Sequence, residues 1–234
     1  QATDSSKLLV IFSSMADPIY AATISGRCFT QNFKTIAKYI PEDTYILRIV
    51  DIGGALTGYY CNTVYLTENQ KNIQSLISMI CQHCSVPKDR TVLYGGSKGA
   101  TAALLHGVLG GYNFIATDPI LDDEYYIKRY NDSHFVSGVY LEPKTTLFQN
   151  VLNRRLSASY NCIITSDRSP QYPYIQSILL KSPAGQDIIC FNSQNSDIHD
   201  HPQVSLKTIN LVTTMINGIL YGIIKTGAWT QLVN

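Results

Sequence analysis

The turn Gly95-Gly-Ser-Lys-Gly99 constrains the fold more than any other stretch of the sequence. Apolar, β-prone residues precede it from Thr91, and a run of small residues from Ala100 to Leu109 follows it. This order is the strand–turn–helix arrangement of the G-x-S-x-G motif, in which the serine sits on a strained turn above the sheet edge. We expect any side chain in place of the first or last glycine to collide with the neighbouring strand or helix.

The same turn predicts a nucleophilic serine. The hydroxyl of Ser97 would stand above the strand, and the N–H of the next residue, Lys98, would point at an oxyanion that develops during attack. Two phosphate-binding interpretations fail. The turn lacks the Gly-Lys-Ser/Thr order of a P-loop, and its glycines lack the G-x-G-x-x-G spacing of a dinucleotide-binding loop.

Apolar runs alternate with helical patterns along the chain, which is typical of an α/β fold with a mostly parallel sheet. The length of 234 residues suits one domain, 1–234, and we expect an α/β-hydrolase-like sheet with helices on both faces. Ligand chemistry then belongs at the carboxyl ends of the strands, where Ser97 lies. The predicted strands are 7–14, 44–52, 91–94, 113–118, 160–166 and 186–191, and the predicted helices are 68–84, 100–109, 146–156, 172–181 and Pro202 to about Ile224.

Residues 121–159 interrupt this alternation. The segment begins with a charged and aromatic stretch, 122–130, continues through turn-like residues, and becomes helical at 146–156. We interpret it as a cap over the strand ends that shapes a substrate pocket. An additional pair of surface helices without such a role is the alternative.

Residue types suited to nucleophilic catalysis follow the predicted strands in the order Ser, Asp, His, which is the chain order of α/β-hydrolases. Ser97 comes first, Asp167 follows the strand at 160–166, and His199 and His201 lie in the last polar loop. A serine hydroxyl needs a base to become nucleophilic, and a carboxylate orients that base. We favour His199, which lies further into the loop, over His201, which directly precedes a proline and could cap the helix.

Other residues remain open as parts of this site. Asp118 ends the strand after the elbow strand and is the rival to Asp167 as the acid. The loop that leaves the first strand would supply a second oxyanion N–H beside that of Lys98, and Ser14 and Met15 are the candidates.

The composition limits which binding partners and which cellular compartment we expect for this protein. A formal net charge of +1 gives no reason to expect nucleic acid or an anionic membrane as the main partner. No apolar run reaches the ~18 residues of a membrane span, and we expect no signal peptide. Six cysteines are too sparse for a disulfide scaffold, and Cys81-Gln-His-Cys84 lacks the second ligand pair of a structural zinc site. We expect a reduced cytoplasmic protein without a metal, and a start at Gln1-Ala-Thr-Asp leaves room for an upstream segment.

Three stretches carry a resemblance to known proteins: the elbow with its Lys after the serine, Thr117-Asp-Pro-Ile-Leu-Asp-Asp-Glu-Tyr-Tyr126, and His199-Asp-His-Pro-Gln-Val204. Together they resemble the XcbB/CpsF family of bacterial capsular polysaccharide biosynthesis proteins. The elbow is also similar to capsule O-acetyltransferases with an α/β-hydrolase fold and to accessory secretion proteins that act on serine-rich glycoproteins. The likeness covers most of the chain, but only the elbow is sharply specific, and Gly96 departs from the serine that those relatives often have.

In the O-acetyltransferases a Ser–Asp–His triad moves acetyl from acetyl-CoA to a sugar hydroxyl, and the resemblance carries this over to Ser97, Asp167 and His199. It implies a serine acyl-transfer enzyme of capsule biosynthesis that acts on a carbohydrate or capsular polysaccharide. No cofactor would bind tightly, acetyl-CoA would be the candidate donor, and Lys98 or Arg168 could meet its phosphates. The protein would work in the cytoplasm, or at the inner face of the membrane with capsule-synthesis proteins. The alternatives are a carbohydrate esterase and a non-catalytic capsule-assembly protein on the same fold.

Overall fold

A six-stranded parallel sheet organises the structure, a computed structural model that describes residues 6–15, 23, 28–29, 31–54, 57–131, 138–156 and 160–224. All six predicted strands form to within a few residues, in the order β2-β1-β3-β4-β5-β6. The four inner strands are buried along almost their whole length, as expected for a sheet that is covered on both faces. The strands are β1 (Lys7–Phe12), β2 (Thr44–Ile49), β3 (Thr91–Gly96), β4 (Asn113–Thr117), β5 (Asn161–Thr165) and β6 (Ile189–Asn192).

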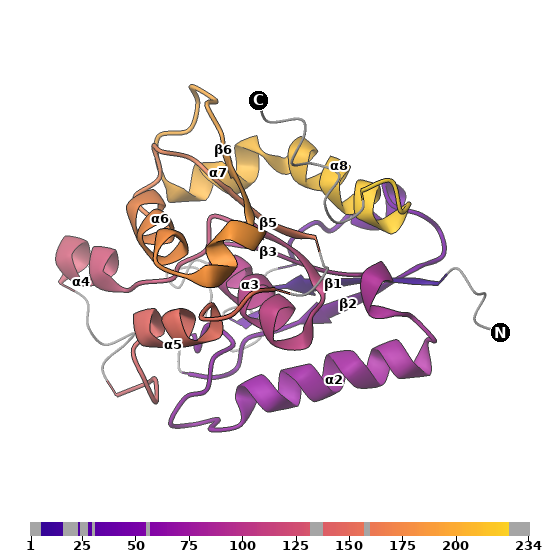
Figure 1. The fold of residues 1–234 in the computed structure, drawn as a ribbon, viewed down its shortest axis with the longest axis horizontal. Coiled ribbons are helices and arrows are strands. Elements are labelled where there is room, and N and C mark those ends of the chain that lie inside the picture. The colour runs from indigo at the N-terminus through magenta and orange to yellow at the C-terminus, as the bar shows by residue number, and fades with distance from the viewer. Residues whose placement is uncertain are drawn as a thin grey trace.

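Helices lie on both faces of this sheet, and in Figure 1 α2 and α5 lie below it and α8 lies above it. Side chains of α2, α3, α5 and α6 share one hydrophobic core with the sheet, and α8 forms a second core on the opposite face. The helices are α2 (Asn69–His83), α3 (Lys98–Gly110), α4 (Glu124–Tyr130), α5 (Lys144–Val151), α6 (Tyr172–Leu180), α7 (His201–Lys207) and α8 (Ile209–Leu220), with 3-10 turns η1 (Ile36–Lys38), η2 (Lys88–Arg90) and η3 (Pro183–Asp187).

Strand β1 shows how the two cores hold the sheet. Leu8, Val10 and Phe12 belong to the core under α2 and α3, whereas Leu9 and Ile11 belong to the core under α8. All five side chains are at most 2% exposed. Burial of each such side chain contributes about 1.5–3 kcal/mol, so the strand is held firmly from both sides.

The site is expected at the carboxyl ends of β1 and β3. The chain leaves β1 for β2 on one side and then crosses back to β3 on the other, so β1 and β3 form the topological switch point of the sheet. Phe12 pairs with Gly95, and the loops that follow these two strands therefore begin side by side.

The last helical segment differs from the single helix predicted from Pro202 to about Ile224. It consists of α7 and α8, separated at Thr208, where the backbone has φ −108° and ψ 8°. The Thr208 hydroxyl donates a hydrogen bond to the carbonyl of Val204 at 2.7 Å. The break allows α7 to lie at the strand ends while α8 packs on the sheet.

The predicted cap at 121–159 contains α4 and α5, and its residues 132–137 and 157–159 lie outside the described residues. Figure 1 shows α4 at the left, standing away from the sheet. A β-bridge between Thr63 and Tyr140 and a backbone hydrogen bond from Val64 to Val139 attach the segment to the loop after β2. Its role as a cap stays a prediction.

A buried histidine on α3 makes the stability of this fold depend on pH. His106 is 0% exposed, its Nε2 lies 3.3 Å from the Tyr60 carbonyl, and its Nδ1 lies 3.0 Å from the Gln74 amide nitrogen. A neutral ring satisfies both contacts, because Nε2–H donates to the carbonyl and Nδ1 accepts from the amide. Burial lowers the pKa of His106 to about 4.

We expect the free energy of unfolding to fall as the pH drops from about 6.5 to about 4. The unfolded chain binds a proton at His106 near its ordinary pKa and the folded protein does so only near pH 4, which amounts to about 3 kcal/mol. Urea unfolding across this range measures the slope. His106→Asn should reduce the slope by up to one proton, and the matched variant His83→Gln, at an exposed position, should keep it. Equal slopes in both variants would contradict the assignment to His106.

Candidate active site

The elbow between β3 and α3 holds Ser97 in a strained conformation, with φ 57° and ψ −123°. The Ser97 N–H donates to the Thr117 carbonyl at the end of β4, at 2.9 Å. A Cβ added at Gly95 would lie 2.0 Å from the Gly99 oxygen, and one added at Gly99 would lie 2.4 Å from the Phe12 oxygen. The prediction that side chains at these two glycines would collide is confirmed, and the close approach ties the elbow to the end of β1.

His201 is the histidine that meets this serine. Its Nε2 lies 2.7 Å from Ser97 Oγ. A capping box at the start of α7 sets the position of His201. In it the Asp200 side chain accepts a hydrogen bond from the backbone N–H of Gln203, and the Gln203 side chain accepts one from the backbone N–H of Asp200. His201 is thereby the first residue of the helix, and side chains at that point lean back toward the helix N-terminus, where the elbow lies.

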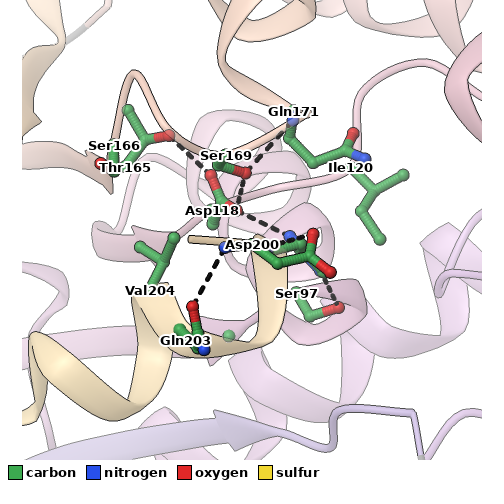
Figure 2. Close-up of polar contacts among 12 residues, drawn as sticks. Ser97, Asp118, Ile120, Thr165, Ser166, Ser169, Gln171, Asp200, Gln203 and Val204 are labelled. Carbon is green, nitrogen blue, oxygen red and sulfur yellow. Dashed lines mark hydrogen bonds and ion pairs between the residues drawn. The ribbon is translucent and has the colours of Figure 1, made fainter. Parts of the chain in front are cut away.

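Asp118 completes the chain of hydrogen bonds at the end of β4. Its Oδ2 lies 2.7 Å from His201 Nδ1, and the carboxylate is 0% exposed. The hydroxyls of Thr165 and Ser169 donate to it at 2.6 and 2.5 Å, and Figure 2 shows Asp118 between these two side chains and Ser97. Because a carboxylate only accepts, the proton of the neutral imidazole lies on Nδ1, and Nε2 is free to accept from Ser97.

The expectation that Asp167 orients His199 is wrong. The Asp167 carboxylate is exposed and accepts from the side chains of Asn192 and Gln194, each at 3.3 Å, which lowers its pKa. His199 is also exposed, and its backbone N–H donates to Gln203 Oε1. The rival residues that the sequence left open, Asp118 and His201, are the ones that lie beside Ser97.

Two hydroxyl groups that support the acid were not predicted. Thr165 ends β5 and Ser169 lies four residues later, on either side of the aspartate that the sequence favoured. The run Thr165-Ser-Asp-Arg-Ser169 is rich in short polar side chains, and such a run at the end of a strand is the signal that could have pointed to them. Both hydroxyls hold the acid of the neighbouring strand.

The loop after β1 lies against the elbow, as expected for a second oxyanion donor. The Ser14 hydroxyl donates to the Gly96 carbonyl at 3.1 Å and accepts from the amide of Asn32. Met15 packs partly buried against the core under α2 and α3. The N–H of Lys98 belongs to the first turn of α3, where backbone N–H groups have no acceptor within the helix. The oxyanion role of Lys98, Ser14 and Met15 stays a prediction.

The Lys98 side chain does not reach the surface, and the expectation that it could meet phosphates is wrong. It is 0% exposed, and its Nζ lies 3.4 Å from Asp51 Oδ2. Arg168, the other candidate for that role, is exposed and donates to the Asn195 carbonyl at 2.7 Å.

Solved structures share this fold at low sequence identity. A chain of the Glycosylation Associate Protein (Gap123) complex from Streptococcus agalactiae matches with a TM-score of 0.65 at 13% identity, over 91% of this chain and 41% of that chain. The capsule O-acetyltransferase of Neisseria meningitidis serogroup A matches with a TM-score of 0.62 at 17% identity, over 90% of this chain and 87% of that chain. A mutant of the same enzyme was solved in complex with CoA.

The fluorophosphonate-binding serine hydrolase FphF of Staphylococcus aureus matches with a TM-score of 0.58 at 10% identity, over 92% of this chain and 85% of that chain. These likenesses establish an α/β-hydrolase-like fold. No family model matches the sequence, and no curated protein matches it. Within the described ranges, no helix combines the length and apolar character needed to cross a membrane, and no three His, Cys, Asp or Glu side chains group so as to hold a metal ion.

Replacing Asp118 by Asn should lower ester turnover by a factor on the order of 10⁴, because the histidine loses the acceptor that fixes its tautomer. The matched control is Asp167→Asn, which removes a carboxylate of the same type from an exposed position and should leave turnover unchanged. The measurements are kcat for p-nitrophenyl acetate and the rate of labelling by a fluorophosphonate, with melting temperatures as a check of folding. A loss confined to Asp167→Asn would restore the assignment made from the sequence.

Proposed function

We propose that the protein is an acyl-transfer enzyme in which Ser97 is the nucleophile, His201 the general base and Asp118 the residue that orients the base. The observation that carries the proposal is the continuous hydrogen-bonded chain from Asp118 through His201 to Ser97. His201 Nδ1 lies 2.7 Å from Asp118 Oδ2, and His201 Nε2 lies 2.7 Å from Ser97 Oγ. A strained serine at the start of a helix adds support, since such geometry persists only where the surroundings enforce it. The likeness to esterases and an acetyltransferase is consistent with it.

In the acylation step, Ser97 Oγ attacks the acyl carbon of an ester or thioester while His201 Nε2 takes its proton. Asp118 stabilises the imidazolium that forms. The Lys98 N–H, with an N–H of the loop at Ser14 and Met15, stabilises the negative charge on the former carbonyl oxygen. His201 then protonates the leaving group, which departs as an alcohol or a thiol, and the acyl group remains on Ser97.

In the second step an acceptor hydroxyl loses its proton to His201 and attacks the acyl carbon. The bond to Ser97 Oγ breaks, and His201 returns the proton to the serine. Water as the acceptor gives hydrolysis and a sugar hydroxyl gives transfer, so the two activities share every residue of this machinery. The choice between them depends on how well the site binds the sugar and excludes water.

We infer that the acceptor is a sugar hydroxyl of a bacterial capsular polysaccharide and that acetyl-CoA is the donor. The resemblance of the elbow and two further stretches to capsule-biosynthesis proteins supports this, as does the likeness of the fold to a capsule O-acetyltransferase whose mutant was solved with CoA. The segment at 121–159 is long enough to cover an acyl-enzyme and limit the entry of water. Likeness to a chain of the Gap123 complex favours protein partners in the same process.

Ser97→Ala should abolish both turnover of p-nitrophenyl acetate and labelling by a fluorophosphonate, because no other group at the elbow can form the acyl bond. The melting temperature should change little, since only one hydroxyl is lost. Intact-mass spectrometry of the labelled protein identifies the modified residue. Ser14→Ala is a matched control that removes a neighbouring hydroxyl and should leave labelling in place. Full activity in Ser97→Ala would rule out the proposed mechanism.

Acetyl-CoA consumption should depend on a polysaccharide acceptor and yield an acetylated polymer. Transfer must exceed hydrolysis although water is present at ~55 M, so the bound sugar has to be oriented at the acyl carbon. The assay follows free CoA with and without acceptor, beside acetate release from acetylated glycan. Acetate release without use of acetyl-CoA would identify an esterase. Neither activity, with Ser97 open to the probe, would favour the non-catalytic assembly protein.

A further inference from the structure

We propose that the buried side chains of Lys98 and Asp51 form a strut that positions the oxyanion hole by linking the elbow to the loop after β2. The inference rests on the acyl-transfer function proposed above. In this arrangement Lys98 has two roles. Its backbone N–H faces the oxyanion, and its side chain holds that N–H in place. Asp51 is then a positioning residue that acts through Lys98 and never touches the substrate.

The strut is completely buried. The side chains of Lys98 and Asp51 are each 0% exposed, and Nζ lies 3.4 Å from Oδ2. The ammonium group forms no hydrogen bond within the described residues, and it lies 5.8 Å from the centroid of the Tyr60 ring. The Asp51 carboxylate is its ion-pair partner, and attraction between buried charges is strong at low dielectric.

Asp51 is itself fixed by the loop that follows it. Its carboxylate accepts from the Thr57 hydroxyl at 2.5 Å, from the N–H groups of Gly58 and Tyr59 at 2.9 Å each, and from the N–H of Gly53 at 3.3 Å. A carboxylate held by four donors is an immobile anchor for the lysine. Movement of this loop would therefore move the lysine and, with it, the first turn of α3.

Tyr60 extends the strut to the other half of the oxyanion hole. Its hydroxyl lies 2.9 Å from the Ser13 carbonyl and 3.1 Å from the Ile49 carbonyl. Ser13 directly precedes Ser14, where the second oxyanion N–H is expected. Tyr60 has φ 59°, a left-handed conformation that is unusual for a tyrosine and that its surroundings must enforce. One connected network therefore reaches both loops that would face the oxyanion.

Stability alone does not account for such a pair. Removing two charges from water is costly, and well-packed apolar residues of similar size commonly stabilise a core as well or better. An orienting role does account for it, because the pair joins the residue that carries the proposed oxyanion N–H to a carboxylate held by four donors. Without Lys98, the Asp51 carboxylate would also lose the cation that compensates its burial.

The chain offers a matched control for the strut. Lys7, the first residue of β1, pairs with Asp43, and their side chains are 12% and 33% exposed. This lysine–carboxylate pair is likewise withdrawn from water, in part. It lies at the amino end of the sheet, away from the carboxyl ends where the elbow sits, so Lys7→Met removes an ion pair of the same kind elsewhere.

The test compares Lys98→Met, Asp51→Asn, their double variant and Lys7→Met in the full chain. Lys98→Met should lower kcat for p-nitrophenyl acetate by about 10- to 100-fold, somewhat less than loss of an oxyanion donor itself. KM and the pH profile of kcat should not change, because neither substrate binding nor His201 is altered. The double variant should be no worse than the poorer single variant, since both substitutions disrupt one network. Lys7→Met should keep kcat, although its melting temperature falls.

Hydrogen exchange supplies a readout that does not depend on turnover. Lys98→Met should accelerate exchange in peptides covering the elbow, the loop around Tyr60 and residues 13–15 together, and Lys7→Met should not. Unchanged exchange at these sites, or wild-type kcat in Lys98→Met, would overturn the strut. Absence of turnover and labelling in the wild type would reject the proposed function, while the exchange data would still decide the linkage. If Lys98→Met alone does not fold, the double variant, which leaves no unpaired buried charge, gives the same comparison.

Discussion

Ser97 occupies a backbone conformation that costs on the order of 1–3 kcal/mol, and the rest of the site depends on the contacts that stabilise it. Three neighbouring parts of the chain provide these contacts. The N–H of Ser97 is bound by the end of β4, Gly99 packs its Cα against the end of β1, and Gly95 leaves room for the first turn of α3. The parallel sheet makes all of this available at one place, because the carboxyl ends of its strands lie together.

The acid and the base reach the serine by different means. Asp118 directly follows the strand next to the elbow strand and has φ 53°, and hydroxyls from β5 and the turn after it bind its carboxylate. His201 arrives on a separate helix whose position is set by its own capping box. The hydrogen-bonded chain thus unites β3, β4, β5 and α7, and no single supersecondary unit contains it.

Sequence patterns were sufficient to predict the strands of the sheet and the position of Ser97 on the elbow. Strands such as β1 are unbroken apolar runs, and the elbow combines glycines, a strand and a helix in one short stretch, so local physics decides both. The acid was not predictable in this way, because Asp118 and Asp167 both follow strands, and only the order β3-β4-β5 makes Asp118 the nearer one. The histidine depended on a similar detail. Asp200 and Gln203 form the capping box that directs His201 to the elbow, whereas the sequence interpretation considered His201 itself as the cap.

The short length of α7 has a consequence for how the protein would lose activity on heating. The helix spans His201–Lys207, and its first residue is the proposed base. The ends of helices fray at free energies well below that of global unfolding. Opening of this first turn would withdraw the imidazole from Ser97 while the sheet and both cores stay folded, so we expect thermal inactivation of the proposed enzyme to begin before the cooperative melting of the sheet. A bound substrate that contacts the histidine would oppose this fraying, and it would protect activity more than it raises the melting temperature.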